Sequence, residues 1–257
     1  MNESVNRKAY STDLTDRQWA EIEPLFKGMR NYRWSKRELT NAVLYLVDSG
    51  CKWRQLPHDF PPYSTVYSFF RRAKISGLWD RIMKHMVIKT RTKAGRNEDP
   101  TYAIIDSQSA KTTDSSEERG FDGGKKTKGR KRHIVVDVMG NILGVIVHAA
   151  NIADTVAGIL VAMIAFQSFP SILKFCGDCG YRGTFVHDVA EKLGISVDIS
   201  EKIKPHEWEK LPHRWIVERT LSWLNHSRRL SKDYEMTTSS EVAMVQISHF
   251  HTLLRRL

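Results

Sequence analysis

Apolar side chains recur at helical spacing through residues 1–90 of this 257-residue chain. Capping-box patterns at residues 15–18 and 35–38 each lead into apolar positions spaced i, i+3, i+4 and i+7, which predicts two amphipathic helices. We expect Gly28 and Gly50 to end them, since glycine commonly follows a helix C-terminus. Two more apolar stripes follow, so the segment predicts a small all-helical domain. The later helices are expected to begin at Ser64 and at Leu78.

The third predicted helix carries basic side chains at the edge of its apolar stripe. Arg71, Arg72 and Lys74 would be accessible to solvent there, which suits a DNA-recognition helix of the helix-turn-helix type. The loop between residues 50 and 63 is longer than the tight turn of that motif. A helical bundle used for dimerisation is therefore an equal alternative, and one domain can serve both purposes.

The pattern of apolar and polar residues changes after residue 90. Residues 91–100 are polar and contain glycine and proline, which predicts a linker, and residues 101–257 then show strand-like apolar runs. A short run ends at Asp106, and a hairpin is expected over residues 133–148. Because helices and strands alternate from there, we expect an α/β domain: a mixed sheet with flanking helices, in the order of a ribonuclease-H-like core. Later strands are expected at residues 172–175 and 195–199, and helices from Asp154, Thr184, Arg214 and Thr238.

Three carboxylates are placed to form one site. Asp106 is expected to end the central strand and Asp178 to follow the strand beside it, so both would emerge at one edge of the sheet. Glu218 lies among apolar residues of a predicted helix, where a carboxylate is unfavourable unless it is paired or bound to metal. An ordinary ion pair with Arg214, one turn earlier, is the simpler alternative.

Converging carboxylates repel one another unless protons or cations lie between them. Hard oxygen ligands with free coordination positions suit Mg²⁺ or Mn²⁺, and two such ions can cleave a phosphodiester without a covalent enzyme intermediate. The three acids therefore predict nuclease or strand-transfer chemistry.

The remaining acids and the cysteines have simpler interpretations. Asp137 is expected in a turn or an exposed strand position, and Asp154 as a helix N-cap. Cys176 and Cys179 have the CxxC spacing, but Cys51 alone remains to complete a zinc site, so the sequence does not favour zinc. Residues 107–130 are rich in serine, glycine and lysine, which predicts a polar loop. The acids of this loop need no partner beyond water: Asp114, Glu117, Glu118 and Asp122.

The net charge of +11 is concentrated at the start of the chain. Residues 1–97 hold 19 lysines and arginines against 9 aspartates and glutamates, whereas residues 98–257 hold 21 against 20. A basic module joined to a nearly neutral one points to a nucleic-acid partner. No apolar run reaches the roughly 18 residues that cross a bilayer, and three cysteines are too few for a disulfide framework. We therefore expect a cytoplasmic protein without a membrane partner.

Two further groups of basic residues flank the three acids in sequence. Six of the eight residues 125–132 are basic, close to where Asp106 is expected, and could hold a phosphate backbone. A solvated run of charge is the alternative. A second group follows Glu218. The predicted DNA-contacting residues of the two groups are Lys125, Lys126, Lys128, Arg130, Lys131, Arg132, Arg228, Arg229 and Lys232.

Taken in order, several segments resemble bacterial insertion-sequence transposases with a DDE triad, of the insertion-sequence-five superfamily. Each segment is weakly specific, but together they cover nearly the whole chain. The segments of the N-terminal part are residues 14–19, 50–57 and 60–67, and those of the C-terminal part are residues 106–109, 129–133, 178–183 and 214–224.

The resemblance implies Asp106, Asp178 and Glu218 as a metal-binding triad that holds Mg²⁺ or Mn²⁺, with two ions expected. It implies excision and reinsertion of a mobile element by attack of water and then of a 3′-hydroxyl on phosphodiesters. The implied partners are double-stranded DNA, as inverted-repeat ends and as target, and further copies of the chain, as a homodimer or higher oligomer on DNA. It also implies a location at the bacterial nucleoid.

Around Glu218 the sequence departs from the family signature. Arg214 matches the signature arginine, which implies a DNA contact, but Leu211 stands where the family has tyrosine and Asn225 where it has lysine. Arg228 or Lys232 would have to substitute. Glu218 follows Asp178 by only 40 positions, which leaves no room for a large inserted domain between them.

Two other functions share most of these features. A DNA-binding regulator or inactive transposase-derived protein would need no intact triad, and a metal-dependent nuclease of the same fold would cut DNA without joining it.

Overall fold

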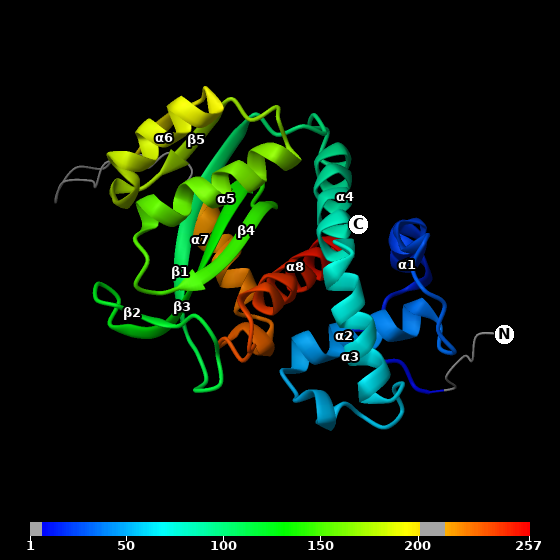
Figure 1. Cartoon of the computed structure of the whole chain (residues 1–257). Helices are drawn as coiled ribbons and strands as arrows, with labels where there is room; N and C mark the ends of the chain where they lie inside the picture. The colour runs from blue at the N-terminus through cyan, green and yellow to red at the C-terminus, as the bar shows by residue number, and fades with distance from the viewer. Residues whose placement is uncertain (1–6, 201–213) are drawn as a thin grey trace.

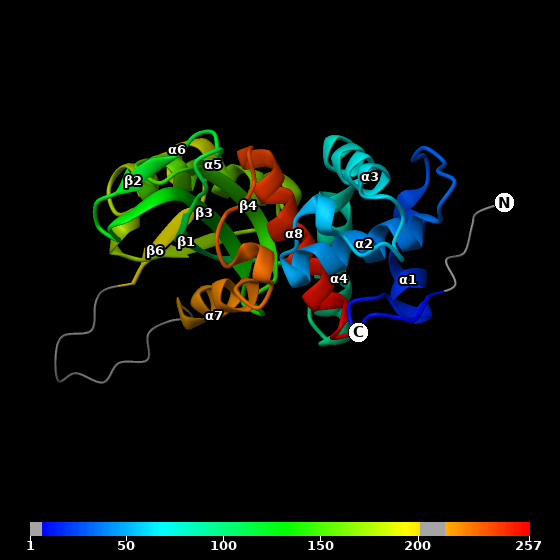
Figure 2. The ribbon, with the colours of Figure 1, turned by 90° about the horizontal axis from the view of Figure 1, so that it is seen from below.

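The computed structural model describes residues 7–200 and 214–257, in which a group of helices packs against a mixed sheet (Figures 1 and 2). Leu211, the residue at the signature tyrosine position, lies outside the described residues. Within them, no helix is both long and apolar enough to span a membrane. The helices of the N-terminal part are α1 (Asp16–Ile22), the 3-10 turn η1 (Glu23–Phe26), α2 (Lys36–Ser49), α3 (Tyr63–Ile75) and α4 (Leu78–Lys93).

Local sequence signals start and stop these helices. The Thr15 side chain accepts from the Gln18 amide and the Gln18 side chain accepts from the Thr15 amide, so the predicted capping box is confirmed. The Ser35 hydroxyl oxygen caps α2 by accepting from the Glu38 amide. Gly50 ends that helix with φ of 71°, a left-handed conformation that favours glycine. The predicted cap at Ser64 is wrong, because α3 already begins at Tyr63.

The sheet has a central strand with antiparallel neighbours on one side and parallel ones on the other. Its order is β2-β3-β1-β5-β6, with β4 also paired to β3. β1, β3 and β4 are antiparallel, whereas β5 and β6 run parallel to β1. The predicted α/β class with a mixed sheet is confirmed. The strands are β1 (Tyr102–Lys111), β2 (Gly120–Asp122), β3 (Thr127–Asp137), β4 (Ile142–Ala149), β5 (Lys174–Gly177) and β6 (Ser196–Ile199).

Helices cover both faces of the sheet. α5 and α6 lie on one face and α7 on the other (Figure 2). α8 lies between the sheet and the N-terminal helices, in contact with β4, α4 and α2. The bounds of these helices are α5 (Asp154–Ser168), α6 (Thr184–Leu193), α7 (Arg214–Leu224) and α8 (Thr238–Leu254).

The first strand is longer than its sequence pattern indicated. β1 continues through Asp106 to Lys111, so the prediction that Asp106 ends the strand is wrong. The expected loop after it contains the rest of β1, β2 and the start of β3. Gly129 allows this pairing, because a side-chain carbon there would lie 2.0 Å from the Ala110 carbonyl oxygen. The charged residues Arg130, Lys131 and Arg132 can belong to β3 because their side chains have partners inside the protein.

The hydrophobic core runs continuously from the N-terminal helices into the sheet. Trp79 of α4 stacks on Phe250 of α8 with ring centroids 6.0 Å apart, and both are buried. The C-terminal helix of the predicted catalytic domain therefore completes the core of the N-terminal helices. α2 and α3 are joined by a long connection that includes the turn η2 (Trp53–Gln55), so the helix-turn-helix likeness stays a prediction.

One buried ion pair ties the helical part to the sheet. Arg91, expected in the linker, lies in α4 and its Nη1 donates to Asp137 Oδ2 at 2.6 Å. Asp137 is fully buried, so the prediction that it occupies an exposed strand position is wrong. Its other oxygen accepts from the amides of Met139 and Asn141 and thereby closes the hairpin turn between β3 and β4.

We expect Arg91→Ala to lower the free energy of unfolding by about 3 kcal/mol, because it leaves the buried Asp137 carboxylate without its counter-ion. Urea unfolding followed by tryptophan fluorescence measures this change. Arg96→Ala, at an exposed position just beyond the same helix, is the matched control and should change stability by less than about 0.5 kcal/mol. Equal effects of the two substitutions would contradict the assigned role of the pair.

Candidate active site

Asp106 and Asp178 lie level with each other on neighbouring strands. β1 pairs with β5 in a parallel register that joins Ile104 to Cys176, and the two aspartates each lie two residues farther along. Asp178 follows β5 directly, and its Oδ1 accepts from the Gly180 amide at 2.8 Å at the start of a short 3-10 turn. The sheet therefore brings both carboxylates to one place, although Asp106 lies within its strand.

Glu218 approaches from α7, which packs on β1 and β3. Its side chain is 57% exposed, so the apolar residues around it in sequence do not enclose it. The Arg214 Nη2 lies 3.4 Å from Glu218 Oε1 and 3.8 Å from Asp178 Oδ2. The ion pair that was the simpler alternative for Glu218 is thus present, and the same guanidinium joins the helix carboxylate to a strand carboxylate.

Asp106 is the most enclosed acid of the three. Burial, with a smaller contribution from the nearby Asp178, raises the pKa of Asp106 to about 6, although the hydrogen bond from the Ser107 amide and the charges of Lys125 and Arg214 oppose the shift. Lys125 is held at this place because its Nζ donates to the Ser107 carbonyl oxygen at 2.9 Å. Negative charge in the site is therefore only partly compensated by the protein.

A second polar cluster lies behind these acids on the other face of β1. Side chains alternate along a strand, so Ser107 and Ser109 point away from the Asp106 side. Ser107 Oγ donates to Asp154 Oδ1 at 3.1 Å, and Ser109 Oγ donates to Asp122 Oδ2 at 2.6 Å. Lys131 of the neighbouring strand β3 forms ion pairs with both acids. Its Nζ lies 3.0 Å from Asp154 and 3.8 Å from Asp122.

Two sequence predictions fail in this cluster. Ala153 is the residue at the N-cap position of α5 and Asp154 is the first helical residue, so the predicted cap is wrong. Asp122 is 9% exposed and closes a turn by accepting from the amides of Gly124 and Lys125, so it is not a solvated loop residue. The dense basic run after Asp122 could have indicated that this acid is paired, because buried lysines and arginines need acidic partners.

An uncharged column of side chains lies beneath the carboxylates. The Tyr181 hydroxyl donates to His133 Nε2, His133 Nδ1 donates to His148 Nε2 at 3.1 Å, and His148 Nδ1 donates to the Ala149 carbonyl oxygen at 2.9 Å. A carbonyl can only accept, so it fixes the direction of every bond in the column. Burial lowers the pKa of His133 to about 3 and also lowers that of His148, so both imidazoles are neutral.

The donor set of the site fits a hard divalent cation. All three acids offer carboxylate oxygens, and the Asp178 and Glu218 side chains keep 38% and 57% of their surface exposed. Mg²⁺ and Mn²⁺ favour such ligands. These oxygens are farther apart than those of the compact set His187, Asp188 and Glu191, whose ligand atoms lie within 4.8 Å of one another on exposed α6. That α6 set also contains an ordinary helical pair, Asp188 with Lys192 at 3.1 Å.

Four of the predicted DNA-contacting residues are buried in ion pairs instead. Arg130, Arg132, Lys131 and Arg229 are at most 7% exposed. Their burial contradicts the predicted DNA contact, because a side chain inside the protein cannot reach a phosphate backbone. The carboxylate partners of the three arginines are Asp233, Glu241 and Glu235, at 3.0, 2.6 and 2.8 Å in that order.

The other predicted contacts remain at the surface. Lys74 donates to the hydroxyls of Ser239 and Ser240 at 3.0 Å, and Lys232 and Arg214 are half-buried. The exposed residues of the set are Arg71, Arg72, Lys125, Lys126, Lys128 and Arg228.

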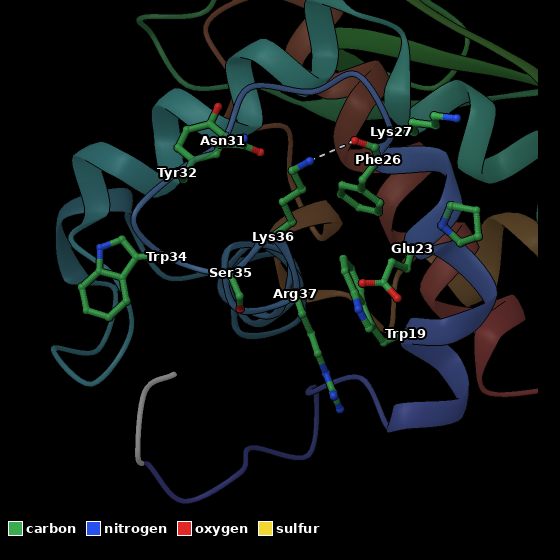
Figure 3. Close-up of a pocket in the computed structure, with 11 residues that line it drawn as sticks. Trp19, Glu23, Phe26, Lys27, Asn31, Tyr32, Trp34, Ser35, Lys36 and Arg37 are labelled. Carbon is green, nitrogen blue, oxygen red and sulfur yellow. Dashed lines mark hydrogen bonds between the residues drawn. The ribbon is translucent and has the colours of Figure 1, made fainter. Parts of the chain in front are cut away.

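A cavity of about 410 Å³ among α1, η1 and the start of α2 is separate from the carboxylates (Figure 3). Two of its cations have partners, since Lys36 Nζ donates to the Phe26 carbonyl oxygen at 3.1 Å and Arg37 pairs with Asp16 at 2.6 Å. These contacts brace α2 against α1, so we assign the cavity no part in the chemistry.

Comparison with known proteins covers both parts of the chain. Residues 14–83 match the family described as "Putative transposase of IS4/5 family", and residues 97–253 match the family described as "Transposase DDE domain". The chain is 29% identical over 130 residues to a Burkholderia cepacia protein named "Putative transposase for insertion sequence element IS402"; the match covers 46% of this chain and 60% of that protein. It is 26% identical over 117 residues to an uncharacterized protein of the same insertion element, covering 42% and 78%.

We expect Asp106→Asn to stabilise the protein without metal at neutral pH. The folded state binds the Asp106 proton more tightly than the unfolded chain does, so ionisation of this group weakens folding as pH rises from about 4 to 6. In EDTA at pH 8 the variant should exceed the wild type by about 2–3 kcal/mol in free energy of unfolding, and below pH 4 the difference should vanish.

Urea unfolding at pH 4, 6 and 8 tests this pH dependence. The exposed Asp99, in the connection between α4 and β1, provides the matched substitution Asp99→Asn, for which we expect no pH-dependent difference. A stability gain in Asp106→Asn that is the same at every pH would overturn the assignment.

Proposed function

The chain belongs to the DDE-domain transposases of insertion sequences, and we propose that it cuts and joins DNA at the ends of such an element through Asp106, Asp178 and Glu218. The observation that carries the proposal is the contact of Arg214 with both Asp178 and Glu218, next to the register that sets Asp178 beside Asp106. Acids distant in sequence thereby share one electrostatic environment.

The fold supports this assignment. The order β4-β3-β1-β5-β6, with three antiparallel strands followed by two parallel ones, is the arrangement expected for the ribonuclease-H-like core of a DDE domain. We propose that class for residues 101–257 and assign DNA binding and dimerisation to the helices of residues 1–90, with α3 as the candidate recognition helix.

The residues of the site have distinct roles in the proposed reaction. Asp106, Asp178 and Glu218 would hold divalent cations, Mg²⁺ or Mn²⁺, which supply an activated water or 3′-hydroxyl and stabilise the leaving oxygen of the phosphodiester. Lys125 and Arg214 limit the repulsion among the acids before a cation binds. Arg214 is also suited to contact the DNA phosphate, since its guanidinium lies at the partly exposed edge of the site.

The exposed basic residues provide the proposed DNA surface. Lys125 and Lys126 lie in the turn between β2 and β3, and Lys128 lies at the start of β3. The Lys125 contact with Ser107 brings this turn next to the triad. Arg228 follows α7 and is exposed, so it can take the place of the signature lysine that Asn225 replaces. The proposed ligands are the element's inverted repeats and target DNA, bound by a homodimer or higher oligomer at the bacterial nucleoid.

Alanine substitution of any one triad residue should abolish metal-dependent nicking. We expect Asp106→Ala, Asp178→Ala and Glu218→Ala each to reduce cleavage of a labelled duplex with element ends by about 100-fold or more, because each removes a cation ligand. Binding of the same duplex in EDTA should be retained. The measurement compares nicked product with Mg²⁺, with Mn²⁺ and with EDTA.

Asp114→Ala, at an exposed position between β1 and β2, is the matched control and should cut like the wild type. A joining assay with a second plasmid separates a transposase from a nuclease of the same fold. Wild-type binding without cutting in either metal would argue for a DNA-binding regulator instead.

Exposed and paired cations should differ in the salt dependence of DNA binding. We expect Lys126→Ala and Arg228→Ala each to reduce the slope of log K against log salt concentration by about 0.9, the value for one lost phosphate contact. Lys192→Ala, whose lysine is paired with Asp188 on α6, should leave the slope unchanged. Titrations by fluorescence anisotropy between 50 and 200 mM salt would detect the difference, and equal slopes for all variants would contradict the proposed surface.

A further inference from the structure

A cleft of about 740 Å³ separates α3 from the chain segment that leads into α8. One wall is formed by η2 and α3, and the other by residues 229–240, so the cleft lies between the helical part and the C-terminal segment that leads into α8. No triad carboxylate lines it. The aromatic and basic side chains of its walls are Trp53, Arg54, Tyr63, Tyr67, Phe70, Arg71, Lys74, Arg229 and Tyr234.

Aromatic rings are left uncovered on both walls. Tyr67 is 47% exposed, and Tyr63 and Tyr234 are exposed to a similar degree. Trp53 supports Tyr67 edge-on, with ring centroids 5.1 Å apart and an interplanar angle of 74°. The Tyr67 ring is therefore held by a partly buried neighbour while part of its own surface stays open.

Positive charge surrounds these rings. The guanidinium of Arg54 lies 5.7 Å from the centre of the Tyr63 ring, and Arg71 is exposed on the next turns of α3. Within residues 7–200 and 214–257, neither arginine has a carboxylate partner at ion-pair distance. The one acid of the lining, Glu235, is buried and already paired with Arg229. The cleft thus combines open π faces with uncompensated cations.

We propose that this cleft binds unpaired nucleotides of a DNA strand, with their bases stacked on the tyrosines and their phosphates near Arg54 and Arg71. Stacking on aromatic side chains beside a basic groove is the general means of holding single strands, and it tolerates any base because every base has a π face. A base inside a duplex offers no free face, so an intact helix does not use these rings.

A second copy of the chain is the other candidate occupant, and charge disfavours it. The chain carries a net charge of +11, and the cleft itself is basic, so docking a like-charged protein there would be opposed electrostatically. A DNA strand provides the complementary charge at every residue of its backbone.

The inference rests on the proposed function, since cutting near an element end leaves unpaired nucleotides for such a cleft to hold. Its test uses the full-length protein in EDTA and two probes: a blunt duplex with an element end, and the same duplex with a four-nucleotide overhang that contains 2-aminopurine. Anisotropy gives the ratio of the two affinities, and the fluorescence of 2-aminopurine falls when the base stacks.

We expect Tyr67→Ala and Tyr234→Ala to reduce the preference for the overhang about tenfold, as the loss of one stacked base predicts, and to remove the quenching. Tyr67→Phe should retain both, because phenylalanine keeps the ring. Ile75→Ala, on the same helix but outside the cleft and 71% exposed, is the matched control and should behave as wild type.

The inference is overturned if the tyrosine variants keep the wild-type preference and quenching, or if Tyr67→Ala instead changes the protein's self-association in sedimentation without DNA. Glu218→Ala separates this test from that of the proposed function, because it should lose cleavage but still quench 2-aminopurine. Cleavage by the wild type without any tyrosine-dependent quenching would reject the cleft alone, and quenching without cleavage would reject the proposed function alone.

Discussion

Buried charge on β3 constrains the arrangement of the whole C-terminal half. Arg130 and Arg132 are enclosed by the protein, and an enclosed guanidinium destabilises the fold unless a carboxylate and further acceptors surround it. Those partners, Asp233 and Glu241, come from the segment after α7. The chain must therefore return from α7 to the sheet at a fixed place, and this return holds α7, with Glu218, over β1. The Arg91–Asp137 pair performs the corresponding task for the helical part.

The candidate site depends on an imbalance of charge that the protein maintains. The column of Tyr181, His133 and His148 beneath the acids is neutral because burial lowers the pKa of both histidines, and Lys131 behind it is committed to Asp154. Within residues 7–200 and 214–257, the cations whose charges act on Asp106 are Lys125 and Arg214, and Arg214 also lies 3.8 Å from Asp178. Burial, with a smaller contribution from Asp178, raises the pKa of Asp106, and the carboxylates of the same site would attract a divalent cation, so folding stability and metal affinity are expected to oppose each other at this residue.

The positive charge of the chain is divided between interior and surface. Arginines 130, 132 and 229 serve the fold, whereas the lysines of the turn after β2 and the arginines of α3 remain open to solvent. The division also explains why the cleft beside α3 stays basic: its one acid is occupied by Arg229, and Arg54 and Arg71 are left to solvent or to a ligand. A surface for duplex backbone and a cleft for unpaired bases can then lie next to each other on α3 without sharing side chains for stacking.

The sequence by itself determined the elements that depend on local signals, such as helix caps and stops. Each such signal depends on neighbours in the chain, so it could be predicted. The examples are the caps at Thr15 and Ser35, the helix end at Gly50 and the alternation of helices and strands. The neighbourhood of Asp106 and Asp178 could be predicted because the expected sheet order makes their strands adjacent, as β1 and β5 are; their joint role with Glu218 as a metal site stays a prediction. Only the tertiary structure decided which charges are buried. The run from Lys125 to Arg132 predicts a basic loop that contacts a phosphate backbone, yet Arg130 and Arg132 belong to a central strand and are buried in ion pairs. Their partners lie about a hundred residues later, and no local pattern predicts a pairing at that distance.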